Sequence, residues 1–81
     1  MKISENELII IYRNNIDKVY KYFFYKLLNK DVSEDLTSNT FHILIDKIND
    51  IDINNIDAYI MGIAKNIFNK YLKEKYKNKE I

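Results

Sequence analysis

Residues 4–29 read SENELIIIYRNNIDKVYKYFFYKLLN and contain the clearest structural signal in the chain. Apolar side chains recur there at steps of three and four, which is the spacing of one face of an α-helix. Ser4 and Glu7 have the spacing of a capping box, which satisfies backbone N–H groups at a helix start. The stretch predicts a long amphipathic helix that can bend or divide at Asn14-Asn15, where helix propensity is low. Its predicted buried face is Leu8, Ile9, Tyr12, Ile16, Val19, Tyr20, Phe23, Phe24, Leu27 and Leu28.

A second helix is predicted from about Asp31 to Ile48. Asp31 is suited to cap its start, and Glu34 follows three residues later as in a capping box. Apolar residues again recur at helical spacing, and a polar set occupies the opposite face. The predicted buried residues are Val32, Leu36, Thr40, Phe41, Leu44, Ile45 and Ile48. The polar set is Asp35, Ser38, Asn39, His42 and Asp46.

A third helix is predicted to follow a loop at residues 49–55 that is rich in asparagine and aspartate. These residue types favour turns and helix caps over helix interiors. Asn54 or Asn55 is the expected cap of the helix, which runs to about Tyr76, and we expect residues 77–81 to fray. Its predicted buried face is Ile56, Tyr59, Ile60, Ile63, Ala64, Ile67, Phe68, Tyr71 and Leu72.

The composition favours one all-α domain. The chain has 81 residues, no proline and one glycine, Gly62, whereas β and α/β folds use these residues at many tight turns. We therefore predict a single domain over residues 1–81, a compact three- to four-helix bundle. The lack of cysteine excludes disulfides and thiolate metal sites. No apolar run approaches the ~20 residues that span a membrane, so we expect a cytoplasmic protein with no membrane partner.

Charge is distributed unevenly along the chain. From Gly62 to Ile81 there are six lysines and two glutamates, which gives +4. Residues 1–61 carry seven basic and ten acidic residues, which gives −3. A basic end suits a polyanion, and an acidic body suits a basic partner. The simpler interpretation is a solvated helix end, because lysines are stabilised near the negative end of the helix dipole.

No group of residues suggests catalysis, a cofactor or a metal site. The chain has one histidine, no cysteine and no glycine-rich phosphate loop. His42 and Asp46 are spaced as neighbours on a helix, but two ligands fall short of the about four that a structural zinc site uses. We therefore expect a binding protein that is not an enzyme and needs no cofactor.

Three blocks of sequence resemble one known family. They are the apolar-aromatic helix around Tyr12, Val19, Tyr20 and Phe23, the run SEDLTSNTF at residues 33–41, and the run DAYIMGIAKN at residues 57–66 followed by Tyr71-Leu72-Lys73. In order and spacing, the chain from about Leu8 to Lys75 resembles region two of extracytoplasmic-function sigma factors of bacterial RNA polymerase. It departs from the family pattern at Ser38, Asn39, Tyr59, Lys65 and Lys70, where glutamine, an acid, tryptophan, arginine and aspartate are usual.

The resemblance implies the helical fold of that region and two binding surfaces. The exposed face of the second helix would dock on the clamp of the polymerase β′ subunit, through Asp35, Ser38, Asn39, His42 and Asp46. The loop before the last helix would capture a flipped base of the single-stranded, non-template minus-ten promoter element, through Asn49, Asp50, Asp52, Asn54 and Asn55. Tyr59 would offer a stacking face, and the last helix would hold promoter DNA through Lys65, Asn66, Asn69, Lys70 and Lys73.

The resemblance also implies a larger context, and other interpretations stay open. We expect this chain to be the N-terminal part of a two-domain protein, and an anti-sigma factor is a further partner that the family suggests. One alternative is a sigma-like helical protein-interaction module without strong DNA binding, and another is a helical domain that binds duplex DNA. Tyr59 lies on the apolar stripe, which favours a place in the core over a role as a stacking surface for a base. Asn66 suits helix packing equally well, and the loop asparagines suit caps and turns.

Overall fold

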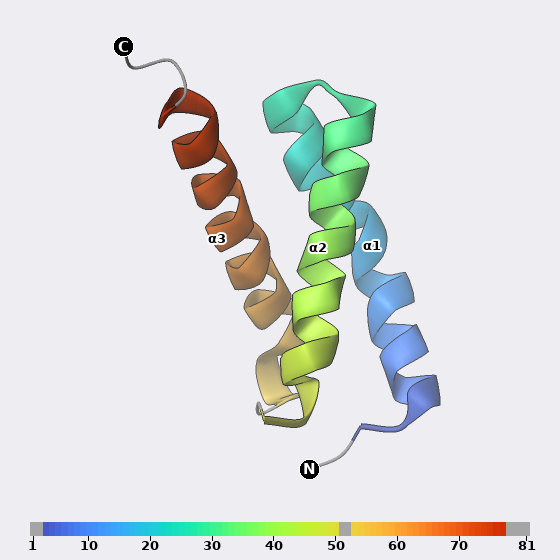
Figure 1. The fold of residues 1–81 in the computed structure, drawn as a ribbon. Helices are drawn as coiled ribbons and strands as arrows, with labels where there is room; N and C mark the ends of the chain where they lie inside the picture. The colour runs from blue at the N-terminus through green and yellow to red at the C-terminus, as the bar shows by residue number, and fades with distance from the viewer. Residues whose placement is uncertain (1–2, 51–52, 78–81) are drawn as a thin grey trace.

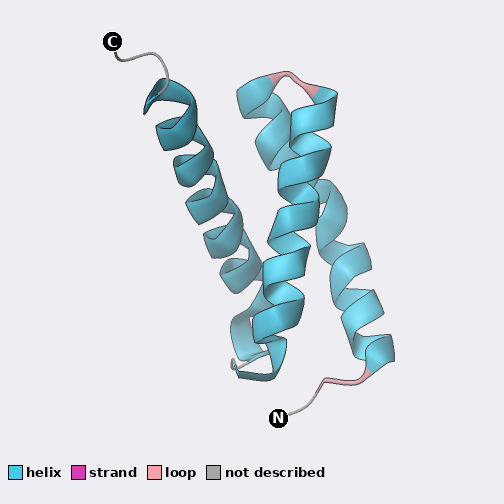
Figure 2. Ribbon diagram, in the orientation of Figure 1, coloured by secondary structure: helices cyan, strands magenta, loops and turns pink. Residues whose placement is uncertain are grey.

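The protein is a bundle of three helices that run up, down and up again (Figure 1). The structure is a computed structural model and describes residues 3–50 and 53–77. Helix α1 spans Glu5–Leu27, α2 spans Lys30–Lys47 and α3 spans Ile56–Lys77, with 3-10 turns η1 (Ile48–Asp50) and η2 (Ile53–Asn55) between α2 and α3. The described residues contain no strand (Figure 2), and the predicted all-α bundle is confirmed.

Helix α1 begins as predicted and continues without a break. Ser4 Oγ accepts a hydrogen bond from the Glu7 N–H, and Glu7 Oε1 accepts one from the Ser4 N–H, both at 3.1 Å, which completes the capping box. The predicted weak point at Asn14-Asn15 does not divide the helix. Asn15 is buried, and its Nδ2 donates to the Ile11 carbonyl at 2.9 Å, so this amide finds its partner within the helix.

A two-residue turn joins α1 to α2. Leu28 has a φ of 51°, and in this left-handed conformation its N–H donates to the Phe24 carbonyl at 2.7 Å and closes α1. Asn29 then caps α2, because its Oδ1 accepts a hydrogen bond from the Val32 N–H at 3.0 Å. The prediction that Asp31 caps this helix is wrong. Asp31 lies inside the first turn, where the helix dipole favours a negative charge.

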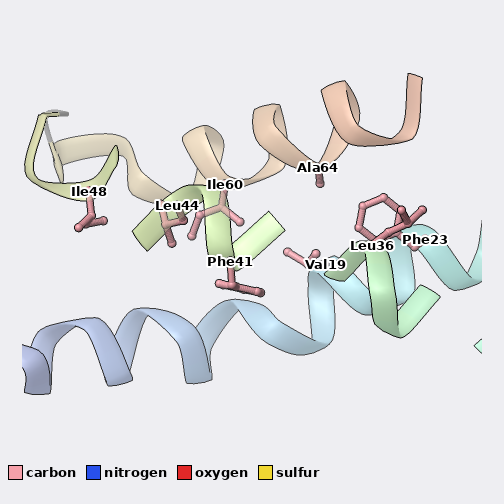
Figure 3. Packing of buried hydrophobic residues seen from close by; sticks show 8 residues of the cluster. All are labelled: Val19, Phe23, Leu36, Phe41, Leu44, Ile48, Ile60 and Ala64. Carbon is pink, nitrogen blue, oxygen red and sulfur yellow. The ribbon is translucent and has the colours of Figure 1, made fainter. Parts of the chain in front are cut away.

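Helix α2 packs more extensively against α1 and α3 than these two helices pack against each other. Figure 3 shows the buried apolar side chains gathered where the three helices meet. They are Val19 and Phe23 of α1, Leu36, Phe41 and Leu44 of α2, Ile48 of η1, and Ile60 and Ala64 of α3. All of them except Ala64 are larger aliphatic or aromatic residues, and close packing makes each sensitive to truncation.

The buried faces differ from the prediction at four positions. Ile9, Tyr12, Leu28 and Ile45 are each at least 46% exposed. The buried stripe of α1 instead includes Asn15, a polar residue that an apolar pattern does not reveal. Leu28 is exposed because it forms the turn after α1. Ile45 lies beside Asp46, at the margin of the polar face of α2.

Small hydroxyl side chains occupy buried positions along α2. Ser33, Thr37 and Thr40 are all buried. The Thr37 hydroxyl donates to the Ser33 carbonyl at 2.7 Å, and the Thr40 hydroxyl donates to the Leu36 carbonyl at 2.8 Å. Ser33 Oγ is buried without a hydrogen-bond partner, an arrangement that lowers the stability of the folded state.

The bundle is elongated, with principal dimensions of 48 × 22 × 17 Å. The turns η1 and η2 lie at the lower end of the bundle in Figure 1, where the chain reverses from α2 into α3. Because the chain reverses there, helices α2 and α3 run antiparallel and side by side, and their outer surfaces border each other.

Within residues 3–50 and 53–77, no helix is both long and apolar enough to cross a membrane.

Candidate nucleic-acid interface

The outer surface of α3 carries a set of lysines and asparagines that we call the basic face. Its members are Lys65, Asn66, Asn69, Lys70 and Lys73, and all five are exposed. Helical spacing places them on the side of α3 opposite the buried Ile60 and Ala64. Only two acids occur in α3: Asp57 lies on another side, and Glu74 lies at the margin, one turn beyond Lys70.

The chemistry of the basic face suits a polyanion with hydrogen-bonding groups. Lys65 and Lys73 are eight residues apart, which spans about 12 Å along the helix axis. Lysine ammonium groups bind phosphates, and asparagine amides both donate and accept hydrogen bonds at base edges. The arrangement therefore offers phosphate contacts and polar contacts to bases along one side of a single helix.

A groove runs between α2 and α3 beside the basic face, and we call it the α2–α3 groove. Its wider part has a volume of about 440 Å³ and an apolar floor of Ile43, Ile63 and Ile67. The remaining lining of this part is Lys47, Tyr59, Gly62, Asn66 and Lys70. A narrower part of about 320 Å³ continues past Lys70 toward Tyr71 and Glu74. Asn66 and Lys70 therefore belong to both the basic face and the groove.

Gly62 lies in the wall of the groove with open space beside it. A Cβ atom added to Gly62 would meet no atom within 4 Å, apart from its neighbours and the backbone of its own helix. Its φ is not positive, so the backbone conformation does not call for glycine either. Neither packing nor local geometry within the chain explains a glycine here. The wall at this point is bare main chain, which allows close approach from outside.

Tyr59 takes part in both the core and the groove. Its side chain is half-buried and packs against the hydrophobic core, as its place on the apolar stripe predicts. It also lines the wider part of the groove, close in sequence to Gly62 and Asn66. Tyr59 is therefore held in place by packing while part of it stays open to solvent.

The predicted DNA-contacting loop lies at the start of α3, away from the far end of the basic face. Asn49 and Asp50 lie in η1, Asn54 and Asn55 lie in η2, and all four are exposed. Asn49 Oδ1 accepts a long hydrogen bond of 3.4 Å from the Ile3 N–H, which links the loop to the N-terminal segment. Asp52 lies outside the described residues, as do residues 78–81, whereas Lys77 is the last residue of α3.

The distance between the loop and Lys73, at the far end of the basic face, limits which residues one ligand can contact. From Asn55 to Lys73 the helix rises about 27 Å, so these residues do not form one compact pocket. None of the four described loop residues lines either part of the α2–α3 groove. An extended ligand that contacts both the loop and the basic face must therefore run along α3.

The polar face of α2 is exposed along its whole length, as predicted. Its residues are Asp35, Ser38, Asn39, His42 and Asp46. Asn39 and His42 also line the narrower part of the groove. The polar face and the basic face therefore border the same groove, although the sequence suggested two separate surfaces.

One lysine and two aromatic residues form a cluster away from the groove, between α1 and α3. The Lys26 ammonium lies 5.1 Å from the Tyr22 ring centroid and 5.4 Å from that of Phe68. The Tyr22 and Phe68 rings meet edge to face at 6.0 Å. Burial raises the pKa of the Tyr22 hydroxyl above its usual 10.0, because burial disfavours the charged phenolate. This cluster has the features of a structural contact between helices.

Sequence reasoning missed the residues that α2 contributes to the wider part of the groove. Lys47 and Ile43 come from α2 and meet Gly62, Ile63 and Asn66 of α3 only in the folded bundle. A single signal was present in the sequence: an isolated glycine inside a helical pattern lowers helix stability and so has another reason when it is retained. That signal points to Gly62, which was not among the predicted site residues, and gives no indication of its partners.

The described residues provide no cluster of metal-ligating side chains. Within residues 3–50 and 53–77, no group of three or more histidine, aspartate or glutamate residues is placed to hold a metal ion. Comparison with known proteins found no matching family model, no matching curated protein and no matching solved structure.

Proposed function

We propose that this chain is the promoter-melting domain of a sigma-type transcription initiation factor. In this role α3 holds the unpaired non-template strand of a promoter, and the polar face of α2 docks on the β′ clamp of RNA polymerase. The observation that carries the proposal is the basic face, where three exposed lysines and two exposed asparagines lie together. The sequence resemblance supports it, because the block at residues 33–41 lies in α2 and the block at residues 57–66 lies in α3.

The basic face favours a strand whose bases are accessible. Each lysine that neutralises a phosphate releases condensed counterions, which gives affinity without sequence preference. Asn66 and Asn69 add amides beside these lysines, and amides read the hydrogen-bonding edges of bases. In a single strand those edges are exposed, so one helix reaches phosphates and bases together. This combination supports binding to unpaired DNA over binding to a duplex.

Melting requires only selective binding and no catalytic group. Extruding a base from a duplex costs a few kcal/mol. A domain that binds the unpaired strand but not the duplex shifts the equilibrium by its difference in affinity for the two forms. The contacts along α3 and in the adjacent groove supply that difference in this proposal.

The polar face of α2 supports docking on a basic protein surface. Asp35 and Asp46 provide carboxylates, and Ser38, Asn39 and His42 provide hydrogen-bonding groups between them. Carboxylates form their strongest hydrogen bonds with cationic partners such as arginine. Complementary charge of this kind speeds association and fixes the orientation of the partner.

A second candidate function is a helical protein-interaction module that binds DNA weakly. Exposed apolar side chains favour it, because Ile45 is 51% exposed beside the polar face, and Ile10 and Tyr25 of α1 are 55% and 71% exposed. Substituting Asp35→Asn and Asp46→Asn together should weaken binding to RNA polymerase core under both candidate functions, the sigma-type factor and the interaction module. Only the sigma-type function also predicts tight binding of single-stranded DNA by the same chain.

Fluorescence anisotropy with short labelled DNA tests the proposal. We expect single-stranded oligonucleotides of minus-ten-like sequence to bind more tightly than matched duplexes. With three lysine–phosphate contacts, the logarithmic salt slope for a single strand should be about −2, so affinity should fall about 20-fold between 50 and 200 mM salt. Equal or tighter duplex binding, or no binding to either form, would exclude the sigma-type function.

A charge-matched pair of variants locates the binding surface. Replacing Lys65, Lys70 and Lys73 by glutamine should remove most of the single-strand binding and flatten its salt dependence. Replacing Lys18, Lys21 and Lys30 by glutamine removes the same charge from exposed positions on α1 and α2, and should change binding much less. Equal losses in the two triple variants would show that net charge, rather than the basic face, determines binding.

A further inference from the structure

We propose that the wider part of the α2–α3 groove holds one unpaired nucleotide, with its base in the groove and its phosphate between Lys47 and Lys70. This inference rests on the proposed binding of single-stranded DNA. It assigns the base pocket to the middle of α3 and to α2, instead of to the loop at residues 49–55. It also adds two residues from α2, Ile43 and Lys47, to the DNA-binding surface.

The size and lining of the groove suit a nucleobase. Its wider part, at about 440 Å³, falls within the range of roughly 300–1,000 Å³ typical of small-ligand sites. The floor is formed by isoleucines, including Ile63, and presents an apolar surface to a flat ring. Asn66 provides one amide at this surface, and an amide both donates to and accepts from a base edge. An apolar surface with a few polar groups is the usual composition of a ligand site.

Gly62 provides the argument that is independent of size. Glycine in a helix interior lowers stability by roughly 1 kcal/mol relative to alanine. Apart from its chain neighbours and the backbone of its own helix, no atom of the chain lies within 4 Å of a Cβ at this position, so the packing of the bundle does not require the glycine. The bare wall lies in the groove itself. A ligand that contacts the helix main chain at Gly62 explains why this residue is present.

The charges of the groove favour a nucleotide over an acidic helical peptide. Lys47 and Lys70 line the wider part, and none of the residues that line it is acidic. Glu74 lines the narrower part, where it would repel an acidic helix lying along the groove. A nucleotide needs only the wider part, where its single phosphate meets the two lysines.

The test combines abasic oligonucleotides with a substitution that fills the groove. Gly62→Met places a side chain in the groove without disturbing the core, because the position is open. Ala58→Met adds the same side chain one turn earlier, at an exposed position that does not line the groove. Each full-length variant is first checked for unchanged helix content by circular dichroism. Each is then titrated with single strands that carry one abasic site, moved along the sequence.

We expect one abasic position to weaken binding to the original protein about fivefold, at the lower end of the range for loss of one stacked base. Gly62→Met should weaken binding to the intact strand by a similar factor and should make that abasic position irrelevant. Ala58→Met should retain the full abasic effect. Lys47→Gln should weaken binding to both intact and abasic strands, because it removes a phosphate contact and not a base contact.

Other outcomes separate this inference from the proposed function. If Gly62→Met keeps the abasic effect, the base lies elsewhere and the groove assignment is overturned, while binding of single strands by the basic face stands. If no abasic site matters, there is no base pocket and the inference also fails alone. If Gly62→Met weakens binding to polymerase core but not to DNA, the groove belongs to a protein partner. If the original chain binds no single strand, the proposed function and the inference fail together.

Discussion

The two sides of α2 are built differently. Toward α1, the Tyr12 and Phe41 rings meet edge to face at 4.9 Å, and Val19 and Phe23 of α1 are completely buried. Toward α3, the bundle leaves a groove with half-buried isoleucines on its floor and a bare glycine in its wall. Ile60 and Ala64 of α3 are also fully buried, so the contrast concerns the outer edge of the contact between α2 and α3. In the proposed function the packing around α1 stabilises the bundle, and this outer edge is the surface left open to a ligand.

Truncating one residue on each side gives the largest expected contrast. Phe23→Ala should lower the free energy of unfolding by about 3–5 kcal/mol, because it leaves a cavity in the core. Ile63→Ala should lower it by less than about 2 kcal/mol, because Ile63 is only partly buried, at the edge of the core beside the groove. Urea unfolding followed by circular dichroism measures both values. Equal losses would contradict the division of roles between the two sides.

Removing a buried hydroxyl should stabilise the protein. Ser33→Ala eliminates an oxygen that is buried without a hydrogen-bond partner, so the free energy of unfolding should rise by about 1–2 kcal/mol. Thr40→Val is the matched control, because the Thr40 hydroxyl donates to the Leu36 carbonyl and its removal should not stabilise. The same urea titration reports both variants. A loss of stability in Ser33→Ala would show that its hydroxyl has a partner, such as a buried water.

Enlarging the side chains of two α3 residues distinguishes the open wall from the packed side. Gly62→Ala should raise the free energy of unfolding by about 1 kcal/mol, because alanine favours helix and the added Cβ meets open space. Ala64→Val, two residues later at a fully buried position, should lower it by about 1–3 kcal/mol through overpacking. Thermal unfolding measures both. A destabilising Gly62→Ala would mean that the groove wall is more crowded than the structure indicates.

The turn between α1 and α2 carries a smaller strain that glycine should relieve. Leu28 adopts a left-handed conformation, which is unfavourable for any residue with a Cβ. Leu28→Gly should therefore raise the free energy of unfolding by about 0.5–1 kcal/mol. Leu28→Ala keeps the Cβ and removes only a side chain that is 75% exposed, so it should change stability little. Similar results for the two variants would place the effect in the side chain and not in the backbone.

The smallest expected effect is a pH dependence from the contact between α1 and α3. Burial raises the pKa of Tyr22 above 10.0, so the folded state holds this proton more tightly than the unfolded state. The resulting stability is fully present below pH 10.0 and is lost as the pH rises through the folded-state pKa. Tyr22→Phe should remove this part of the alkaline loss, measured by urea unfolding at a series of pH values. Parallel losses in both proteins would assign the effect to other groups.

Most of the fold was predictable from the sequence because its signals are local. The Ser4 capping box, the helical spacing of apolar residues and the polar loop at residues 49–55 gave the helices to within a few residues. The cap of α2 was misassigned because Asn29 and Asp31 are both good caps. The left-handed turn at Leu28 decides between them, and it is not visible in a sequence with leucine at that position.

The candidate site was only partly predictable because half of it depends on tertiary packing. The lysines and asparagines of the basic face share one helix, so spacing alone brings them together. The groove forms only when α2 packs against α3, which brings Lys47 close to residues such as Asn66 that lie far away in sequence. The sequence therefore identified half of the site and missed the half that α2 contributes.

The most direct test is to map the binding of a short single-stranded oligonucleotide on the full chain by NMR amide chemical shifts. Binding along α3 and in the groove predicts the largest changes at Gly62, Asn66, Lys70 and Lys47, with little change at Lys18 and Lys21 of α1. A matched duplex should produce smaller changes at the same residues. Largest changes on α1, or equal patterns for the single strand and the duplex, would contradict the assignment of the α2–α3 surface to unpaired DNA.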